Sequence, residues 1–236
     1  MSKKYLIAGM VTDIAYKFPY TANMLKNYEY FGDNPVQISA RITVEDFLAE
    51  AKLLKGESDD FIENSAILRK LSNVLLDYGA MLFHGSTVKY NGNAFVFTAP
   101  SGTGKSTHTA LLKQLLGDKL CYINDDKPIL KVENGKVIAY GSPWNGKHNL
   151  GENVSAPLKA ICVVTRADEN SISKVSPEDF IKVLFEQSVG FDNAITANKV
   201  LDVLDVISKT CKFYLLKCNM DISAAKCSLE GMLYED

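Results

Sequence analysis

Apolar residues recur along the chain in short runs and in helical stripes, and these two patterns predict its strands and helices. The short runs predict strands over residues 5–14, 35–43, 81–90, 94–98, 120–124, 127–132, 137–140, 158–165, 171–175 and 211–218. The stripes, with apolar residues every three to four positions, predict helices over residues 44–54, 58–78, 107–116, 177–188, 193–209 and 221–232. Irregular backbone is expected over residues 16–30 and 141–155.

Two tight turns and one boundary organise these elements. Asn91-Gly92 and Asn134-Gly135 are typical of hairpin turns, so the strands on either side of each turn should pair. At 236 residues the chain is long enough for one domain or for two small ones. A boundary near Gly79 would separate a small α+β N-terminal portion, residues 1–79, from a larger α/β portion, residues 80–236, unless the two form one continuous domain.

The composition is that of an ordinary soluble globular protein. The formal net charge of −2 provides no field that would attract nucleic acid or an anionic membrane, so neither is expected as a partner. Thr12-Asp13 ends the first apolar run too early for a signal peptide, and no run is long enough to cross a bilayer. The five dispersed cysteines indicate reduced thiols of a cytoplasmic protein rather than a structural zinc site.

The clearest chemical motif follows the strand predicted over residues 94–98. From Ala99 to Thr107 the sequence matches the phosphate-binding loop G-x-x-x-x-G-K-[ST], with Ala in place of the first Gly, and a predicted helix follows. Glycines in such a loop let backbone N–H groups converge on phosphate oxygens. The residues expected to bind a nucleotide are Ser101, Gly102, Thr103, Gly104, Lys105, Ser106 and Thr107. Lys105 would reach the β- and γ-phosphates, and the Ser106 hydroxyl would hold Mg²⁺.

A second motif, Asp125-Asp126, ends the strand predicted over residues 120–124. Phosphate loops need a metal-coordinating acid at the end of a nearby strand, and adjacent carboxylates at a strand end point in different directions. One carboxylate could therefore face Mg²⁺ while the other acts as the general base toward an acceptor hydroxyl. The sequence leaves open which aspartate does which, and an Asx turn that closes the strand is the alternative.

Other candidates are weaker and have structural alternatives. His84 could contact the γ-phosphate or orient an aspartate, although a lone histidine in a strand is more often a satisfied core residue. Lys147 could supply positive charge to the transferring phosphoryl group. Trp144 could stack on a base or substrate, or it could anchor its loop on the core. His108 is expected to be exposed, and residues 165–168 echo a guanine-reading motif only by chance.

Residues His84-Gly85, Ser101–Ser106 and Asp125-Asp126 occur in an order that resembles the HPr kinase/phosphorylase family and its relative phosphoenolpyruvate carboxykinase. The segment from Tyr140 to Lys147 is similar to a small, divergent subgroup of HPr-kinase-like proteins. The resemblance implies a phosphate-loop kinase fold with a mixed sheet over residues 80–236. It places His84 at the phosphoryl-transfer site and allows a homo-oligomer. The Arg-Gly-Leu-Gly signature of true HPr kinases is absent after Asp126, so HPr is not the expected substrate.

These observations predict an ATP- and Mg²⁺-dependent kinase that transfers the γ-phosphoryl group to an alcohol. The metal ligands would be Ser106 and Asp125, and the catalytic residues Asp126, Asp125, His84 and Lys147. The acceptor would be a Ser-like hydroxyl on a small molecule or peptide. The alternative is a nucleotide-binding regulatory module with little or no turnover, which needs the loop but no positioned base. A GTPase is a third and weaker reading, because it rests only on residues 165–168.

Overall fold

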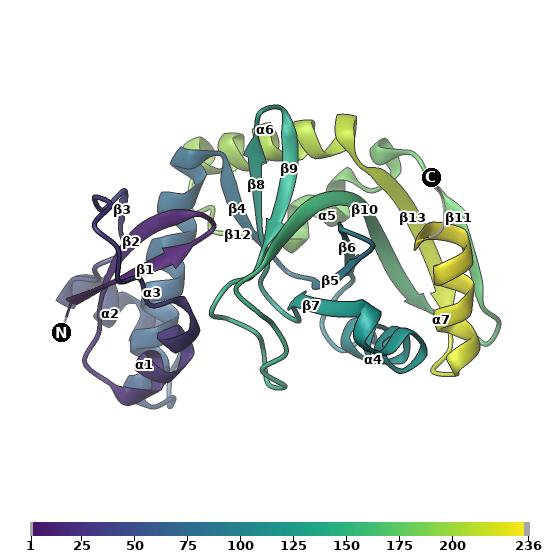
Figure 1. The fold of residues 1–236 in the computed structure, drawn as a ribbon. Coiled ribbons are helices and arrows are strands. Elements are labelled where there is room, and N and C mark those ends of the chain that lie inside the picture. The colour runs from purple at the N-terminus through teal and green to yellow at the C-terminus, as the bar shows by residue number, and fades with distance from the viewer. Residues whose placement is uncertain (1, 234–236) are drawn as a thin grey trace.

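The computed structural model describes residues 2–233, and it forms two β-sheets with helices packed around them (Figure 1). The smaller sheet has three strands, β1 (Ser2–Ile7), β2 (Met10–Ala15) and β3 (Ile38–Ser39). The larger sheet has ten strands and contains both parallel and antiparallel pairs. The predicted α/β fold class with a mixed sheet and a small α+β N-terminal portion is confirmed.

The N-terminal portion differs in detail from its prediction. A single strand over residues 5–14 is wrong, because Ala8 and Gly9 both adopt positive φ, 48° and 74°, and turn β1 back onto β2 as a hairpin. Residues 16–30 are irregular only in part, at residues 16–18 and 29–30. Helix α1 (Pro19–Leu25) begins there, with Pro19 in the first turn, where the missing N–H group costs nothing. The strand predicted over residues 35–43 shortens to the two residues of β3.

Two helices complete this portion, as predicted. Helix α2 (Val44–Leu53) starts with a capping box, in which Thr43 and Asp46 satisfy each other's backbone N–H groups. Helix α3 (Asp59–Leu75) buries Ile67, Leu71 and Leu75 completely. Phe61, in the first turn of the helix, is 37% exposed.

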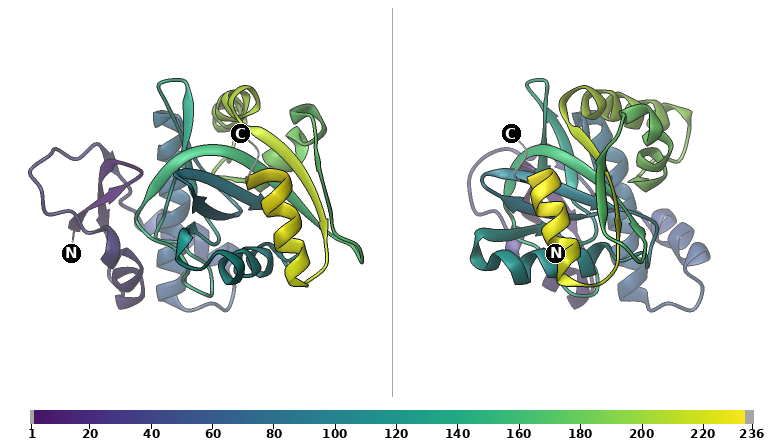
Figure 2. Two further views of the ribbon diagram at one scale, coloured as in Figure 1. Left: turned by 45° about the vertical axis from the view of Figure 1, so that its right-hand side comes forward. Right: turned by 90° about the vertical axis from the view of Figure 1, so that its right-hand side faces the viewer.

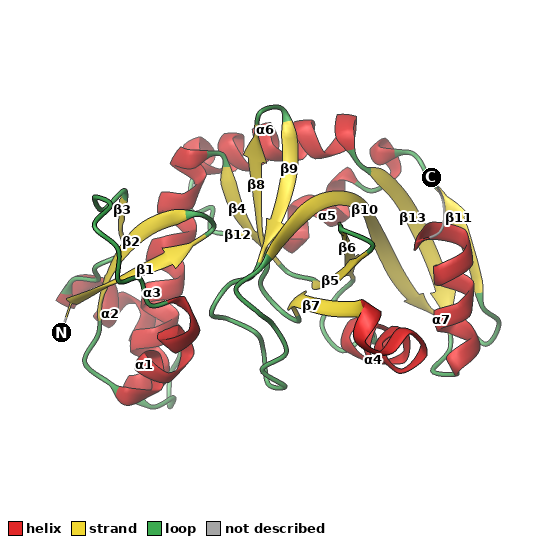
Figure 3. Ribbon diagram, viewed as in Figure 1, coloured by secondary structure: helices red, strands yellow, loops and turns green. Residues whose placement is uncertain are grey.

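The ten-stranded sheet runs in the order β12-β4-β8-β9-β10-β6-β5-β7, and β13 joins β10 to β11 beside this path (Figure 3). Its strands are β4 (Ala80–Phe83), β5 (Ser86–Tyr90), β6 (Asn93–Thr98), β7 (Leu120–Asn124), β8 (Ile129–Glu133), β9 (Lys136–Tyr140), β10 (Ser155–Arg166), β11 (Ser171–Lys174), β12 (Ser188–Val189) and β13 (Lys212–Cys218). The long strand β10 pairs antiparallel with β9 at its start and parallel with β6 and β13 farther along. It therefore lies in the middle of the sheet, and both predicted hairpin turns are confirmed.

Helices cover both faces of this sheet (Figure 2). Helix α6 (Ala194–Thr210) packs its apolar stripe into one core with Val96 and Ile161. On the other face, α4 (Lys105–Leu116) and α7 (Ile222–Ser228) pack into a second core with Phe97 and Cys162. Neighbouring β10 residues thus point into opposite cores, which is the alternation expected of a strand covered on both sides.

Two predicted helices are shorter than expected. The helix predicted over residues 177–188 is a 3₁₀ turn (Pro177–Asp179) followed by α5 (Ile181–Gln187). The closing helix ends as α7 at Ser228 and continues as a π-helical turn (Leu229–Leu233). None of the helices within residues 2–233 is long and apolar enough to span a membrane. The five cysteines are free thiols.

A third core lies between the N-terminal portion and the large sheet. It brings Tyr5 of β1 and Leu71 of α3 together with Leu82 of β4 and Ile129 of β8, all fully buried. Trp144, from the long loop after β9, belongs to the same core. The predicted boundary near Gly79 falls between α3 and β4, and this shared core spans it.

Candidate functional site

The predicted site residues meet at one edge of the large sheet. Strands β6 and β7 are both antiparallel to β5, which lies between them, so their carboxyl ends share an edge with the start of β5. The phosphate loop follows β6, the aspartate pair follows β7, and His84-Gly85 precedes β5. Together they line a cavity of about 550 Å³, to which the loop after β9 also contributes. Its lining residues are His84, Ser101, Gly102, Gly104, Lys105, Ser106, Thr107, Asp125, Asp126, Gly146, Lys147 and His148.

The phosphate loop adopts the backbone that its glycines permit. Gly102 and Gly104 have φ of 76° and 124°, and Gly104 is the N-cap of α4. Ala99 does not adopt a positive φ, so Ala in place of the usual Gly causes no strain. Thr103 is the one predicted loop residue outside this cavity. Its hydroxyl donates to the Pro100 carbonyl.

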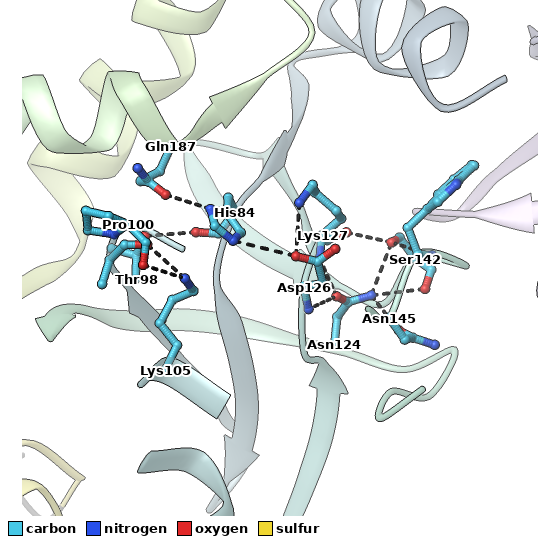
Figure 4. A network of polar contacts seen from close by, with 12 residues as sticks. His84, Thr98, Pro100, Lys105, Asn124, Asp126, Lys127, Ser142, Asn145 and Gln187 are labelled. Atoms are coloured by element: carbon cyan, nitrogen blue, oxygen red, sulfur yellow. Dashed lines mark hydrogen bonds and ion pairs between the residues drawn. The ribbon is translucent and has the colours of Figure 1, made fainter. Parts of the chain in front are cut away.

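Lys105 lies folded back along the loop (Figure 4). Its Nζ donates to the carbonyl oxygens of Ala99 at 2.8 Å and of Pro100 at 3.3 Å. Burial lowers the pKa of Lys105, and the charge of Lys127 acts in the same direction, while Asp126 and Asp125 oppose the shift. The ammonium group is thus held among neutral carbonyls, where an anion on the loop would be its natural partner.

The two adjacent aspartates have different surroundings. Asp125 is 6% exposed, and its Oδ1 accepts a hydrogen bond from the Ser86 hydroxyl at 2.6 Å. Burial raises the pKa of Asp125, while hydrogen bonds from Ser86 and Ser106 oppose that shift. Asp126 is more exposed and lies 3.0 Å from Lys127 Nζ and 3.6 Å from His84 Nε2. The carboxylates therefore point in different directions, as expected at a strand end.

The Asx turn weighed as an alternative is also present. Asn124 Oδ1 accepts the backbone N–H groups of Asp126 at 2.8 Å and Lys127 at 2.6 Å. Its side-chain amide nitrogen donates to Ser142 and, at 2.6 Å, to Asn145 Oδ1. Asn124 thus ties the acidic pair to the loop after β9, and the turn supports the site instead of replacing it.

His84 lies against Gln187, the last residue of α5 (Figure 4). Its backbone N–H donates to the Gln187 carbonyl, and its Nδ1 lies 2.7 Å from Gln187 Oε1. Burial lowers the pKa of His84, and the charges of Lys127 and Lys105 lower it further. A single strand over residues 81–90 is wrong, because the chain leaves the sheet at His84-Gly85. A Cβ at Gly85 would lie 2.9 Å from Val96 Cγ1, so only glycine fits there.

The loop after β9 is anchored by its tryptophan. Trp144 is buried, and its Nε1 donates to Asn64 Oδ1 of α3 at 2.9 Å. Anchoring is therefore the role that the structure shows for this residue. Beyond the anchor, Gly146 turns with a φ of 67° close against Asp126, and exposed Lys147 lines the cavity.

Two further expectations change with the structure. His108 is not exposed: it is 2% exposed, its Nε2 lies 2.9 Å from the Ser228 hydroxyl, and burial lowers its pKa to about 4. Arg166, in the segment taken as a chance echo, donates to the carbonyl oxygens of Thr103, at 3.1 Å, and Gly102. That segment therefore lies directly against the phosphate loop.

Three residues that contact the predicted site residues were not predicted from the sequence. Ser86 and Lys127 stand next to the predicted motifs, and a polar residue at each strand end could have indicated them. Gln187 is 103 residues from His84, and no local pattern connects the two.

Comparison with known proteins assigns the chain to a family. None of the curated proteins matches the sequence. Among solved structures, the Hpr(Ser) kinase/phosphatase from Coxiella burnetii is similar at 12% identity, over 54% of this chain and 94% of that chain, with a TM-score of 0.30. A superposition this loose carries no inference about activity. Residues 54–218 match the family described as SynChlorMet cassette protein ScmC. Since that match covers more than half of the sequence, the chain belongs to the ScmC family.

Proposed function

We propose that this protein is an ATP- and Mg²⁺-dependent kinase that transfers the γ-phosphoryl group to a hydroxyl acceptor. The observation that carries the proposal is the single cavity in which a phosphate loop, a pair of carboxylates, a histidine and an exposed lysine converge. A loop that only bound nucleotide would not need two differently oriented acids beside it. The arrangement supports chemistry at the end of a bound phosphate chain.

The residues present fit a nucleotide with its magnesium ion. The backbone of Gly102 and Gly104, the start of α4 and the Lys105 ammonium group together suit a triphosphate. Ser106 and Asp125 are the pair that would hold Mg²⁺, because both line the cavity beside the loop and both offer oxygen ligands. Bound there, Mg²⁺ supplies positive charge that offsets the charge on the phosphate oxygens.

Asp126 is the residue best placed to act as general base. It is less buried than Asp125 and faces the cavity between His84 and Lys127. Its carboxylate would accept the proton of the acceptor hydroxyl as that oxygen bonds to the γ-phosphorus. The bond to the bridging oxygen then breaks, and ADP leaves with the electron pair. Lys105 and Lys147 would stabilise the charge on the transferring group.

The acceptor side of the cavity is the exposed side. Gly146, Lys147 and His148 are exposed there, so an incoming hydroxyl reaches Asp126 across this loop. The proposed acceptor is a Ser-like hydroxyl on a small molecule or a peptide. Lys147 favours an acceptor that carries negative charge near its hydroxyl group.

Thermal unfolding with and without Mg-ATP tests whether the phosphate loop binds the nucleotide. Ligand at about a hundred times its dissociation constant adds about 2.7 kcal/mol to the free energy of unfolding. We expect that gain in the wild type and its loss in Lys105→Ala. Lys119→Ala, an exposed lysine beyond the far end of α4, is the matched control. Absence of a shift with any nucleotide would remove the basis for the proposal.

Transfer itself is tested with ATP labelled in the γ-phosphate and a panel of alcohols and seryl peptides. Label on an acceptor, lost in Asp126→Asn, is the expected result. Tight binding of ATP without transfer to any acceptor and without hydrolysis would instead favour the nucleotide-binding regulatory module.

A further inference from the structure

A second cavity lies on the other side of the phosphate loop, and the proposed reaction does not use it. Its volume is about 550 Å³. Gly102, Gly104 and Thr107 line both this cavity and the one that contains the aspartates. The loop is therefore a wall shared by two cavities.

The far wall is built from the carboxyl ends of β10 and β13. Strand β10 lies between β6 and β13 and runs parallel to both. In open α/β sheets, ligands bind in the crevice outside such strand ends. Val164, Ala167 and Cys218 give this wall an apolar floor. Met220 stands at its rim with 80% of its surface exposed, which is unusual for a large apolar side chain. A flat apolar ligand would cover it, and methionine adapts readily to such a surface.

The polar groups of the wall are arranged around this floor. Arg166 is tied to the loop carbonyls of Gly102 and Thr103, which holds its planar cation beside the cavity. Planar guanidinium groups stack on aromatic rings. The side chain of Asn219 is already engaged, since it donates to the Asp168 carbonyl and accepts from the Asp221 N–H. The Asp168 carboxylate has no hydrogen bond or ion pair within residues 2–233 and only accepts hydrogen bonds.

We propose that this second cavity binds the nucleoside of the nucleotide, with the base between Val164 and Met220 and its amino group toward Asp168. The inference rests on the proposed function, which places the γ-phosphate in the aspartate cavity and so leaves the nucleoside end of the chain facing the other way. A carboxylate acceptor selects a base edge that carries an amino donor, as adenine does, over the carbonyl-rich edge of uracil. The segment from Thr165 to Asp168 thus forms part of the base-binding wall.

Calorimetric titration of the full chain with Mg-ATP, Mg-UTP and inorganic triphosphate with Mg²⁺ tests this assignment. In the wild type, ATP should bind at least about tenfold more tightly than inorganic triphosphate, and UTP should fall between them. The phenylalanine side chain of Ala167→Phe would fill the cavity. The affinity for ATP should therefore fall to that for triphosphate, and the affinity for triphosphate should stay unchanged. Glu169→Phe, two positions along and outside the cavity, is the matched control.

Met220→Ala is a second variant that cannot disturb the core, because the side chain is exposed. It should weaken the binding of ATP and leave the binding of triphosphate unaffected. Equal affinity of the wild type for ATP and triphosphate, or ATP binding that survives Ala167→Phe in a folded protein, would overturn the nucleoside site and leave the phosphate loop standing. If neither ATP nor triphosphate bound, the proposed function and the nucleoside site would both be wrong.

Discussion

Asp125 and Asp126 are neighbours in the sequence, yet their surroundings fit them for different tasks. Asp125 is buried against Ser86, while Asp126 faces His84 and the cavity. A buried carboxylate beside serine hydroxyls suits a metal ion, whereas a general base must be reached by its proton donor. We therefore propose that Asp125 is the metal ligand and Asp126 the general base, a division of roles that the sequence left open.

Replacing Asp126 by Asn tests that division. The amide keeps the shape but cannot accept the proton, so we expect phosphoryl transfer to fall by about 10²- to 10⁴-fold while ATP binding persists. Transfer rates and nucleotide affinity are measured side by side. Asp118→Asn, at a fully exposed carboxylate after α4, serves as the control. A turnover close to that of the wild type would mean that another residue is the base.

We propose that Gln187 is a positioning residue, because its contact with the site is through His84. Its hydrogen bond raises the pKa of His84 against the larger effect of burial. Gln187→Leu should therefore lower that pKa further, which a titration of the histidine ring signals by NMR would detect. Gln114→Leu, an exposed glutamine on α4, should leave the titration unchanged. An unchanged His84 pKa in Gln187→Leu would contradict the contact.

His108 makes the free energy of unfolding depend on pH. Burial lowers its pKa to about 4 from an ordinary value of about 6.5, so between these two values the unfolded chain takes up a proton that the folded chain refuses. This residue's contribution is therefore fully present above about pH 6.5 and falls by about 3 kcal/mol as the pH approaches 4. The unfolding curves of His108→Gln should lack this component, whereas those of His148→Gln, at an exposed histidine, should retain it. Parallel curves for wild type and His108→Gln would contradict the burial.

At the scale of elements, the sequence predicted best where turn chemistry was explicit. Asn-Gly pairs at residues 91–92 and 134–135 adopt positive φ and close their hairpins as expected. The turn at Ala8 was missed, because alanine rarely takes the left-handed conformation that it adopts there. The break at His84-Gly85 was also missed, although a glycine inside a strand pattern can indicate a close backbone approach such as the one to Val96.

The start of α6 shows how much one cap contributes. Asn193 accepts the backbone N–H groups of Ile195 and Thr196, and Thr196 completes the capping box. Asn193→Ala should lower the free energy of unfolding by about 1 kcal/mol, read from the denaturant midpoint. Asn198→Ala, at an exposed position inside the same helix, should be neutral or slightly stabilising. Equal losses in the two variants would show that the cap has no special role.

At the scale of the whole molecule, the third core decides how the two portions behave. Leu82 and Ile129 of the large sheet are fully buried against residues of the N-terminal portion. We propose that residues 1–79 and 80–236 form one cooperative unit, although the sequence changes character between them. Cutting the chain at Gly79 would leave an exposed apolar face on the larger piece.

Calorimetric unfolding tests that proposal. We expect one transition whose calorimetric and van't Hoff enthalpies agree, and poor solubility of residues 80–236 expressed alone. The intact chain under the same conditions is the control. Two separate transitions, or a stable and monomeric fragment 80–236, would instead show two independent domains.

The candidate site was predicted in its local motifs and missed in its long-range contacts. The phosphate loop and Asp125-Asp126 are contiguous in sequence, so their spacing alone indicated them. That they line one cavity follows from β5 lying between β6 and β7, an order that the sequence does not state. Gln187 and Arg166 reach the site only through the folded sheet, and Trp144 could not be assigned before its bond to Asn64 was seen.

The single tryptophan of the chain is also a spectroscopic reporter. Its indole is buried and hydrogen-bonded on the loop that continues to Lys147, so selective excitation reads this one segment without any label. Fluorescence emission at short wavelength is expected at rest, as for an indole shielded from water. Any ligand that draws the loop away from α3 would move that emission to longer wavelength, and a stopped-flow trace would give the rate of that step.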